Sequence, residues 1–161
     1  MCGITGIFDT RGSGHAVDPA LLRRMNDSQS HRGPDEGSVH VEPGVGFGHR
    51  RLSIIDVATG LQPLFNEDRS VVVVFNGEIY NYQPLMAELQ ALGHVFATRS
   101  DTEVIVHAWE AWGADCVRRF RGMFAFALWD RNRQTFFMAR DRLGVKPLYY
   151  ALLDDGTLLF G

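Results

Sequence analysis

Lysine, cysteine and long hydrophobic runs are scarce in this sequence. Only Lys146 among the 16 basic residues is a lysine, and the arginines are scattered along the chain rather than clustered. The formal net charge of −3 predicts no broad attraction to nucleic acid or to an anionic membrane. The longest aliphatic run, residues 71–75, is far too short to cross a bilayer. We therefore expect neither a nucleic-acid partner nor a membrane span.

The two cysteines, Cys2 and Cys116, are too few to form a disulfide framework. No basic segment followed by an apolar one opens the chain, so we expect no signal peptide. Free thiols persist in a reducing compartment, and these features together predict a cytoplasmic protein. None of the six histidines has the spacing of a metal-binding motif such as His-Glu-x-x-His, so no metal is expected.

Length and composition predict one domain with an ordinary core, since 45% of the 161 residues are hydrophobic and 22% are charged. Apolar periodicity and turn residues predict strands at residues 4–8, 38–41, 45–53, 71–75, 95–98, 123–129, 135–139, 148–153 and 157–160, and helices at 19–30, 82–92 and 101–112. The apolar runs at 71–75 and 123–129 are typical of strands buried on both faces. Two packed sheets covered by helices satisfy this pattern best.

Capping residues mark the ends of the predicted helices. Asp18, which precedes a proline, and Asn81 occupy expected N-cap positions. Ser100 and Glu103 have the spacing of a capping box. Gly93 follows the second helix, where a glycine commonly takes the positive φ that ends a helix.

Cys2, directly after the initiator methionine, is the most unusual residue of the chain. Its side chain is small, so an aminopeptidase is expected to remove Met1 and to expose the α-amine of Cys2. The thiol has an ordinary pKa of roughly 8.5 and the amine one of roughly 7.7–8.0, so near neutral pH the amine is a candidate base beside a good nucleophile. The alternative is a small residue that is cysteine by chance.

Two polar stretches are candidates for a functional site. Asn76 and Gly77 follow the buried run, and Asn-Gly at this position commonly forms a turn. Alternatively, the two residues place a side-chain amide and a backbone N–H side by side, and such a pair of donors stabilises an oxyanion. Residues 31–35, His-Arg-Gly-Pro-Asp, shape a polar pocket or form a turn between a helix and a strand. Spacing alone favours the turn.

Several charged residues have both a functional and a structural interpretation. For the Arg50-Arg51 pair, the functional interpretation is that one arginine binds a carboxylate through two hydrogen bonds, and the structural one is an ordinary surface arginine. For Asp101, the functional interpretation is that it binds an ammonium group, and the structural one is that it stabilises the dipole of the helix whose first turn it occupies. Glu78 adds a carboxylate beside Gly77. The alternating glycines at 44, 46 and 48 do not match a phosphate-binding loop, and we expect them to allow close packing against another sheet.

Seven motifs occur in order along the chain: MCGI at 1–4, HRGPD at 31–35, RLSIID at 51–56, NGEIYN at 76–81, SDTE at 100–103, GMFAFA at 122–127 and RDRLGVKPLYY at 140–150. Each is weak alone, but the set is very specific. Over essentially its whole length the chain resembles the glutaminase domain of glutamine-hydrolysing asparagine synthetases, class II glutamine amidotransferases with the N-terminal-nucleophile hydrolase fold. Residues 8–12 and 107–109 look most like the synthetase-type amidotransferases of bacterial exopolysaccharide and exosortase gene clusters.

The resemblance implies an α+β fold for residues 1–161, a four-layer αββα sandwich of two antiparallel sheets. It implies that Cys2 attacks the side-chain amide of glutamine with its own amine as base. The Asn76 side chain and the Gly77 N–H are expected to form the oxyanion hole. Glutamine is expected to be held by an arginine, a backbone segment and two acids, namely Arg51, Leu52, Ser53, Ile54, Ile55, Glu78 and Asp101.

In this family a second, C-terminal domain activates aspartate with ATP and Mg²⁺ and receives the ammonia through an internal tunnel. We therefore expect no cofactor in residues 1–161, and ATP and Mg²⁺ only in a longer protein. The chain stops at Gly161 in mid-strand by pattern, which suggests a fragment of such a protein. The implied partners are L-glutamine, the C-terminal synthetase domain and, as a possible addition, a second copy in a homodimer.

Three functions compete at this point. The leading hypothesis is a glutaminase that feeds ammonia to asparagine synthesis. The second keeps the glutaminase but passes the ammonia to a cell-envelope or exopolysaccharide precursor. The third is a non-catalytic scaffold domain, and the presence of Cys2, Arg51, Asn76, Gly77 and Asp101 argues against it.

Overall fold

A computed structural model of the chain describes residues 2–52 and 61–161. Its strands form two sheets in which every pairing is antiparallel. The first sheet has the order β2 (Glu36–Glu42), β3 (Val45–Arg51), β1 (Gly3–Asp9), β9 (Thr157–Phe160) and β8 (Tyr150–Leu152). The second has the order β4 (Leu64–Phe65), β5 (Val71–Ile79), β6 (Gly122–Asp130) and β7 (Thr135–Arg140).

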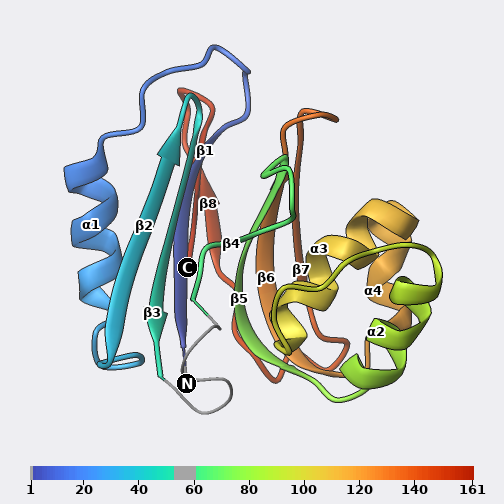
Figure 1. Ribbon diagram of the computed structural model, residues 1–161. Helices are drawn as coiled ribbons and strands as arrows, with labels where there is room; N and C mark the ends of the chain where they lie inside the picture. Colours follow the sequence, from blue (N-terminus) through green and yellow to red (C-terminus); the bar gives the residue numbers. More distant parts are fainter. Residues whose placement is uncertain (1, 53–60) are drawn as a thin grey trace.

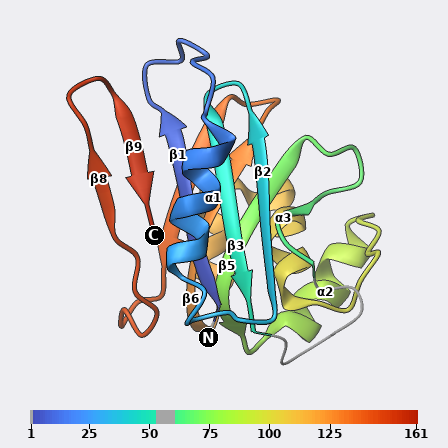
Figure 2. The ribbon, with the colours of Figure 1, turned by 90° about the vertical axis from the view of Figure 1, so that its left-hand side faces the viewer.

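The helices cover the outer faces of the two sheets, so the molecule has four layers (Figure 1). Helix α1 (Pro19–Ser28) packs on β1, β2 and β3, and Figure 2 shows it crossing the face of that sheet. Helix α3 (Asp101–Trp112) packs on β5, and α2 (Tyr82–Ala91) packs on α3. A 3₁₀ turn (Gly113–Asp115) and α4 (Cys116–Arg119) complete this layer. The predicted α+β, four-layer sandwich of two antiparallel sheets is confirmed.

Strand β5 is buried on both faces, as its aliphatic run predicted. Val72 and Val74 point toward the first sheet, where they pack in one cluster with Ile4, Val45, Phe47, Ala125, Ala127, Trp129 and Phe160. Val71, Val73 and Phe75 point the other way and pack with the residues of α2 and α3. The strand therefore lies at the centre of the molecule, and its position is fixed from both sides.

The predicted helix starts are confirmed, but one predicted strand is wrong. The carboxylate of Asp18 accepts a hydrogen bond from the Ala20 N–H at 2.8 Å, and the Ser100 hydroxyl accepts one from the Thr102 N–H at 3.1 Å. Glu103 does not complete a capping box with Ser100. Its carboxylate instead accepts bonds from the N–H groups of residues 97 and 98, both at 2.7 Å. Residues 95–98 are therefore tethered to α3 instead of pairing as a strand.

Asn81 precedes α2, as predicted, but its side chain does not cap that helix. The side-chain amide instead donates to the Arg119 carbonyl at 3.0 Å and accepts from the Arg121 N–H at 2.9 Å. It thereby ties the start of α2 to the segment between α4 and β6. The 3₁₀ turn and α4 were not predicted from the sequence.

The close packing expected of the alternating glycines is present, but its partner was predicted wrongly. A Cβ atom built on Gly46 would lie 2.7 Å from Val17 Cγ1 and 3.1 Å from Leu22 Cδ2. One built on Gly48 would lie 3.1 Å from Asn26 Cγ. Most of these neighbours belong to α1 and the segment before it, so the glycines admit the helix and not the second sheet.

None of the helices in residues 2–52 and 61–161 is long and apolar enough to cross a membrane.

Asp141 organises the loop that follows β7. Its buried carboxylate accepts hydrogen bonds from the N–H groups of Phe124, Leu143, Val145 and Lys146 at 2.9–3.1 Å. Burial alone would raise the pKa of Asp141, but these bonds, led by that from Lys146, hold it below its usual value. One carboxylate thus fixes the loop on β6 and turns Lys146 inward.

Replacing Asp141 by asparagine is expected to lower the free energy of unfolding by about 3 kcal/mol. The neutral amide oxygen accepts weaker hydrogen bonds than a carboxylate, and the amide N–H₂ group would face backbone N–H donors with which it cannot form a hydrogen bond. Chemical denaturation at pH 7 measures the loss. The native pKa is depressed, so the contribution of the carboxylate exists above its unfolded pKa and disappears as the pH falls through its native pKa. The difference between the two proteins should therefore shrink in acid.

The matched control is Asp155→Asn, because Asp155 is exposed and its carboxylate accepts a hydrogen bond from Thr157 N–H at 2.8 Å. A loss below about 1 kcal/mol is expected for this surface change. Equal losses in the two variants would contradict the role given to Asp141.

Candidate active site

A cavity of about 190 Å³ lies between the two sheets near the start of β1 and the N-terminus of α3. All the predicted site residues that the structure describes line it, namely Cys2, Arg51, Leu52, Asn76, Gly77, Glu78 and Asp101. Ser53, Ile54 and Ile55 lie outside the described residues. The fold thus gathers side chains from both sheets and one helix around a single space.

Cys2 directly precedes β1 and lines the cavity. Its Sγ lies 3.8 Å from the Leu52 carbonyl oxygen, which belongs to the segment after β3. The carbonyl of Cys2 accepts a hydrogen bond from Arg32 Nε at 3.2 Å. Residues 31 and 32 form the turn that spacing favoured, and Arg32 also holds the backbone of Cys2.

Asn76 and Gly77 lie within β5, so the turn considered for them is excluded. Glu78 and Asn76 pair with Met123 and Ala125 of β6, and the ladder continues to Tyr80, whose N–H donates to the Arg121 carbonyl at 2.7 Å. Residues of an antiparallel ladder alternate in the edge toward which their N–H points. The even-numbered residues here face β6, so the odd-numbered N–H groups face the opposite edge.

At that opposite edge the N–H of Gly77 lies between two donors with known partners. The Phe75 N–H donates to Gln62 Oε1 at 2.6 Å, and the Ile79 N–H donates to Asp101 Oδ2 at 2.9 Å. The Gly77 N–H between them is directed toward the cavity, which Gly77 lines. A Cβ atom on Gly77 would lie 2.6 Å from Phe124 Cα, so β6 approaches too closely for any other residue.

The Asn76 side chain adds a second donor at the same place. Asn76 is 3% exposed and lines the cavity, and within residues 2–52 and 61–161 its side-chain amide has no hydrogen-bond partner. A buried amide normally has one. Two such donors beside a thiol are suited to stabilise an oxyanion that forms during attack on a carbonyl.

Opposite charges share the cavity. Arg51 is 6% exposed, and its Nη1 lies 3.7 Å from Glu36 Oε2. Burial raises the pKa of Asp101, although hydrogen bonds, led by that from the Ile79 N–H, oppose the rise. Burial and the charge of Asp101 raise the pKa of Glu78. A guanidinium and two carboxylates are the charges that bind the α-carboxylate and α-ammonium of a zwitterionic amino acid.

Lys146, Gln62 and His49 also line the cavity, and the sequence did not predict them. Lys146 is 5% exposed, and its charge opposes the rise in the pKa of Glu78. A lysine is almost never fully buried without a compensating partner, and nothing in the sequence alone indicates that Lys146, the one lysine of the chain, is buried. Gln62 was missed because its role is to accept a hydrogen bond from the Phe75 N–H, which depends on where β4 begins.

His49 stays neutral in the folded protein. It lies on β3 and is 1% exposed. Burial lowers its pKa to about 4; a hydrogen bond with the Phe75 backbone opposes this shift, and the charge of Arg51 adds to it. Its Nε2 atom has no hydrogen-bond partner within the described residues. An uncharged imidazole therefore forms part of the cavity wall near Cys2.

A family model described as "Glutamine amidotransferase domain" matches residues 1–161, which is the whole chain. This chain belongs to the glutamine amidotransferase domain family. The amidotransferase domain is 45% identical over 96% of its length to asparagine synthetase [glutamine-hydrolyzing] 1 of Bacillus subtilis and covers 25% of that protein. It is 43% identical over 99% of its length to asparagine synthetase [glutamine-hydrolyzing] 2 of Oryza sativa subsp. japonica and covers 27% of it.

The domain thus spans about a quarter of the length of the curated relatives that it matches. Among solved structures it is similar to glutamine phosphoribosylpyrophosphate amidotransferase from B. subtilis complexed with ADP and GMP, with a TM-score of 0.75. The match covers 98% of the amidotransferase domain and 41% of the other chain at 23% identity. At that identity the likeness shows the fold alone.

The neutral state of His49 predicts how the stability of the amidotransferase domain depends on pH. The native pKa is about 4 and the ordinary value is 6.5, so between these values the unfolded state binds more protons. Stability should therefore fall as the pH is lowered through this window. Denaturation curves from pH 4 to 7 should show a shallower fall in His49→Gln.

The exposed His15 provides the control, because His15→Gln should keep the pH dependence of the parent protein. An unchanged dependence in His49→Gln would contradict the assignment of a buried neutral imidazole.

Proposed function

We propose that this domain hydrolyses L-glutamine to L-glutamate and ammonia through a thioester on Cys2. The observation that carries the proposal is the position of the Gly77 N–H and the Asn76 amide, two donors in the cavity that Cys2 also lines. Cys2 directly precedes β1 of the first sheet, whereas Asn76 and Gly77 belong to β5 of the second. Membership of the glutamine amidotransferase family supports the same reaction.

In the proposed reaction, Met1 has been removed and the α-amine of Cys2 takes the proton from its thiol. The thiolate attacks the side-chain amide carbon of glutamine, and the negative oxygen of the tetrahedral intermediate is held by Asn76 and Gly77. The amine returns the proton to the leaving nitrogen, so the C–N bond breaks and ammonia departs. Water then attacks the thioester, which releases glutamate and restores the thiol.

The charges of the cavity select the substrate in this proposal. Arg51 binds the α-carboxylate of glutamine, and Glu78 and Asp101 bind its α-ammonium. The raised pKa values of the two acids fit this role, because a cation that enters the cavity stabilises their ionised forms. In the same proposal, backbone groups of Leu52, Ser53, Ile54 and Ile55 take part in binding glutamine.

The finer function concerns the longer protein. We infer that a C-terminal synthetase domain of the same chain uses this ammonia, with ATP and Mg²⁺, to convert aspartate to asparagine. The names and the greater length of the curated relatives support this inference. A reducing, cytoplasmic environment belongs to the same proposal, because Cys2 and Cys116 are free thiols and a cysteine nucleophile must stay reduced.

Two alternatives retain parts of this proposal. A cell-envelope or exopolysaccharide precursor as nitrogen acceptor would leave the glutaminase chemistry unchanged. A non-catalytic scaffold would not need the Gly77 N–H and the Asn76 amide to face the space beside a thiol, so the geometry of β5 favours an enzyme.

Glutamate release from glutamine by the purified chain tests the proposal. The wild type, with removal of Met1 confirmed by mass spectrometry, should release glutamate, and Cys2→Ala should release none. Cys116→Ala is the control, because burial raises the pKa of the Cys116 thiol to about 12 and makes it inert. No activity in the processed wild type, or equal activity in Cys2→Ala, would contradict the proposal.

Removing one oxyanion donor should slow catalysis while the protein stays folded. Asn76→Ala is expected to lower kcat by roughly 10²–10³-fold. The exposed Asn132 offers the matched control, and Asn132→Ala should keep the wild-type rate. A change in KM with an unchanged kcat in Asn76→Ala would show that Asn76 binds glutamine without stabilising the intermediate.

A further inference from the structure

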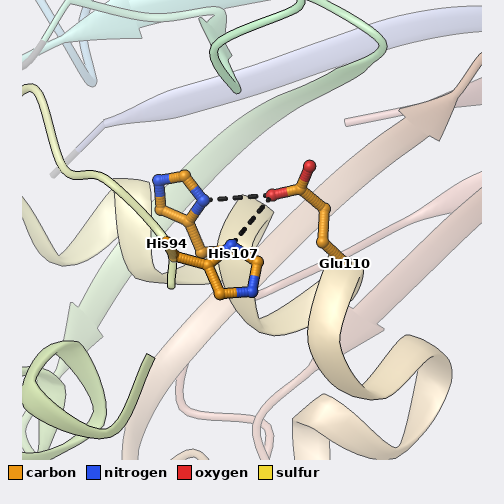
Figure 3. A group of neighbouring side chains, drawn as sticks. All are labelled: His94, His107 and Glu110. Carbon is orange, nitrogen blue, oxygen red and sulfur yellow. Dashed lines mark hydrogen bonds and ion pairs between the residues drawn. The ribbon is translucent and has the colours of Figure 1, made fainter. Parts of the chain in front are cut away.

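A second polar cluster, separate from the glutaminase cavity, lies where the segment after α2 meets α3. Figure 3 shows His94 and His107 with both rings turned toward one carboxylate oxygen of Glu110. His107 and Glu110 belong to α3, and His94 follows α2. The spacing of the histidines in the sequence predicted no metal site, because it gives no sign that the fold brings these segments together.

The three side chains present one set of ligand atoms to a common point. Glu110 Oε2 lies 3.0 Å from His107 Nδ1 and 3.5 Å from His94 Nδ1. All three atoms lie within 4.8 Å of one another. Ligands of a tetrahedral zinc ion stand roughly 2.0–2.2 Å from the metal, so such an ion would need only small movements of these side chains.

Two of the atoms that do not face this point, Glu110 Oε1 and His107 Nε2, have polar neighbours. Glu110 Oε1 accepts a hydrogen bond from Asn66 Nδ2 at 2.7 Å. His107 Nε2 lies 3.6 Å from Glu103 Oε1, and within the described residues it has no hydrogen-bond partner. The Glu103 carboxylate is held in this position by the backbone N–H groups of residues 97 and 98. A carboxylate behind the second ring nitrogen of a histidine is the usual outer partner of a metal-binding imidazole.

The backbone and the local charge also suit a cation. His94 is placed by its own N–H, which donates to the Leu89 carbonyl at 3.1 Å after Gly93 takes a φ of +101°. Besides Glu103 and Glu110, a third carboxylate approaches the cluster, because Glu67 Oε2 lies 3.9 Å from His107 Nδ1. Three acids thus surround two imidazoles, and the Glu67 side chain, half exposed, is within reach as a fourth ligand.

We propose that His94, His107 and Glu110 bind a divalent transition-metal ion, with Zn²⁺ as the ion best suited to two imidazoles and a carboxylate. Glu67 or water completes the coordination. The ion joins the segment after α2 to the C-terminal half of α3, so its role is structural. The site shares no residue with the glutaminase cavity, and the proposal does not depend on the glutaminase reaction.

Calorimetric titration of the metal-free chain with Zn²⁺ tests this proposal. All proteins carry Cys2→Ala, because a thiol beside a free α-amine would itself chelate zinc. The parent should bind one equivalent, and Zn²⁺ should raise its Tm. His94→Gln and Glu110→Gln should weaken binding by at least the roughly 10–100-fold that the loss of an outer partner costs.

His15→Gln is the control, since His15 is an exposed histidine outside the cluster. It should bind zinc as the parent does. Circular dichroism and the metal-free Tm of His94→Gln should match the parent, which separates loss of a ligand from loss of the fold. No saturable binding by the parent, or equal binding by the parent and His94→Gln, would overturn the proposal.

Discussion

The two edges of strand β5 differ, and the rest of the site depends on that difference. One edge pairs with β6 from Val71 to Ile79, whereas β4 covers the other only opposite Val72 and Val73. Beyond that point Gln62 and Asp101 accept the neighbouring N–H groups, and the Gly77 N–H faces the cavity.

Other parts of the sandwich then add chemical groups around this donor. The first sheet supplies Cys2 and Arg51, because β1 and β3 are antiparallel neighbours and Gly3 pairs with Arg50. The helical layer supplies Asp101, whose carboxylate bonds to β5 and so fixes the distance between helix and strand. The loop after β7 supplies Lys146, held by Asp141. A site assembled across layers in this way requires the whole fold.

Sequence motifs predicted the fold and the lining residues from Cys2 to Asp101, because motifs record residue types whose chemistry is specific. They did not predict His49, whose importance comes from its burial, or Gln62, whose importance comes from its position just before β4. Residues 95–98 were predicted as a strand from their composition, but the Glu103 carboxylate accepts hydrogen bonds from the N–H groups of residues 97 and 98. Local propensity does not indicate which side chain will accept the N–H groups of a segment in the folded chain. The His94–Glu110 pairing was hidden for the same reason.

The most direct test of the glutaminase account is mass spectrometry of the chain quenched in acid during turnover of isotopically labelled glutamine. The account predicts a labelled glutamyl adduct on the N-terminal peptide, bound to the thiol of Cys2 and released by hydroxylamine. The adduct should not accumulate when Cys2 is replaced. An adduct on any other residue, or glutamate formed under these conditions without an adduct on Cys2, would contradict the account.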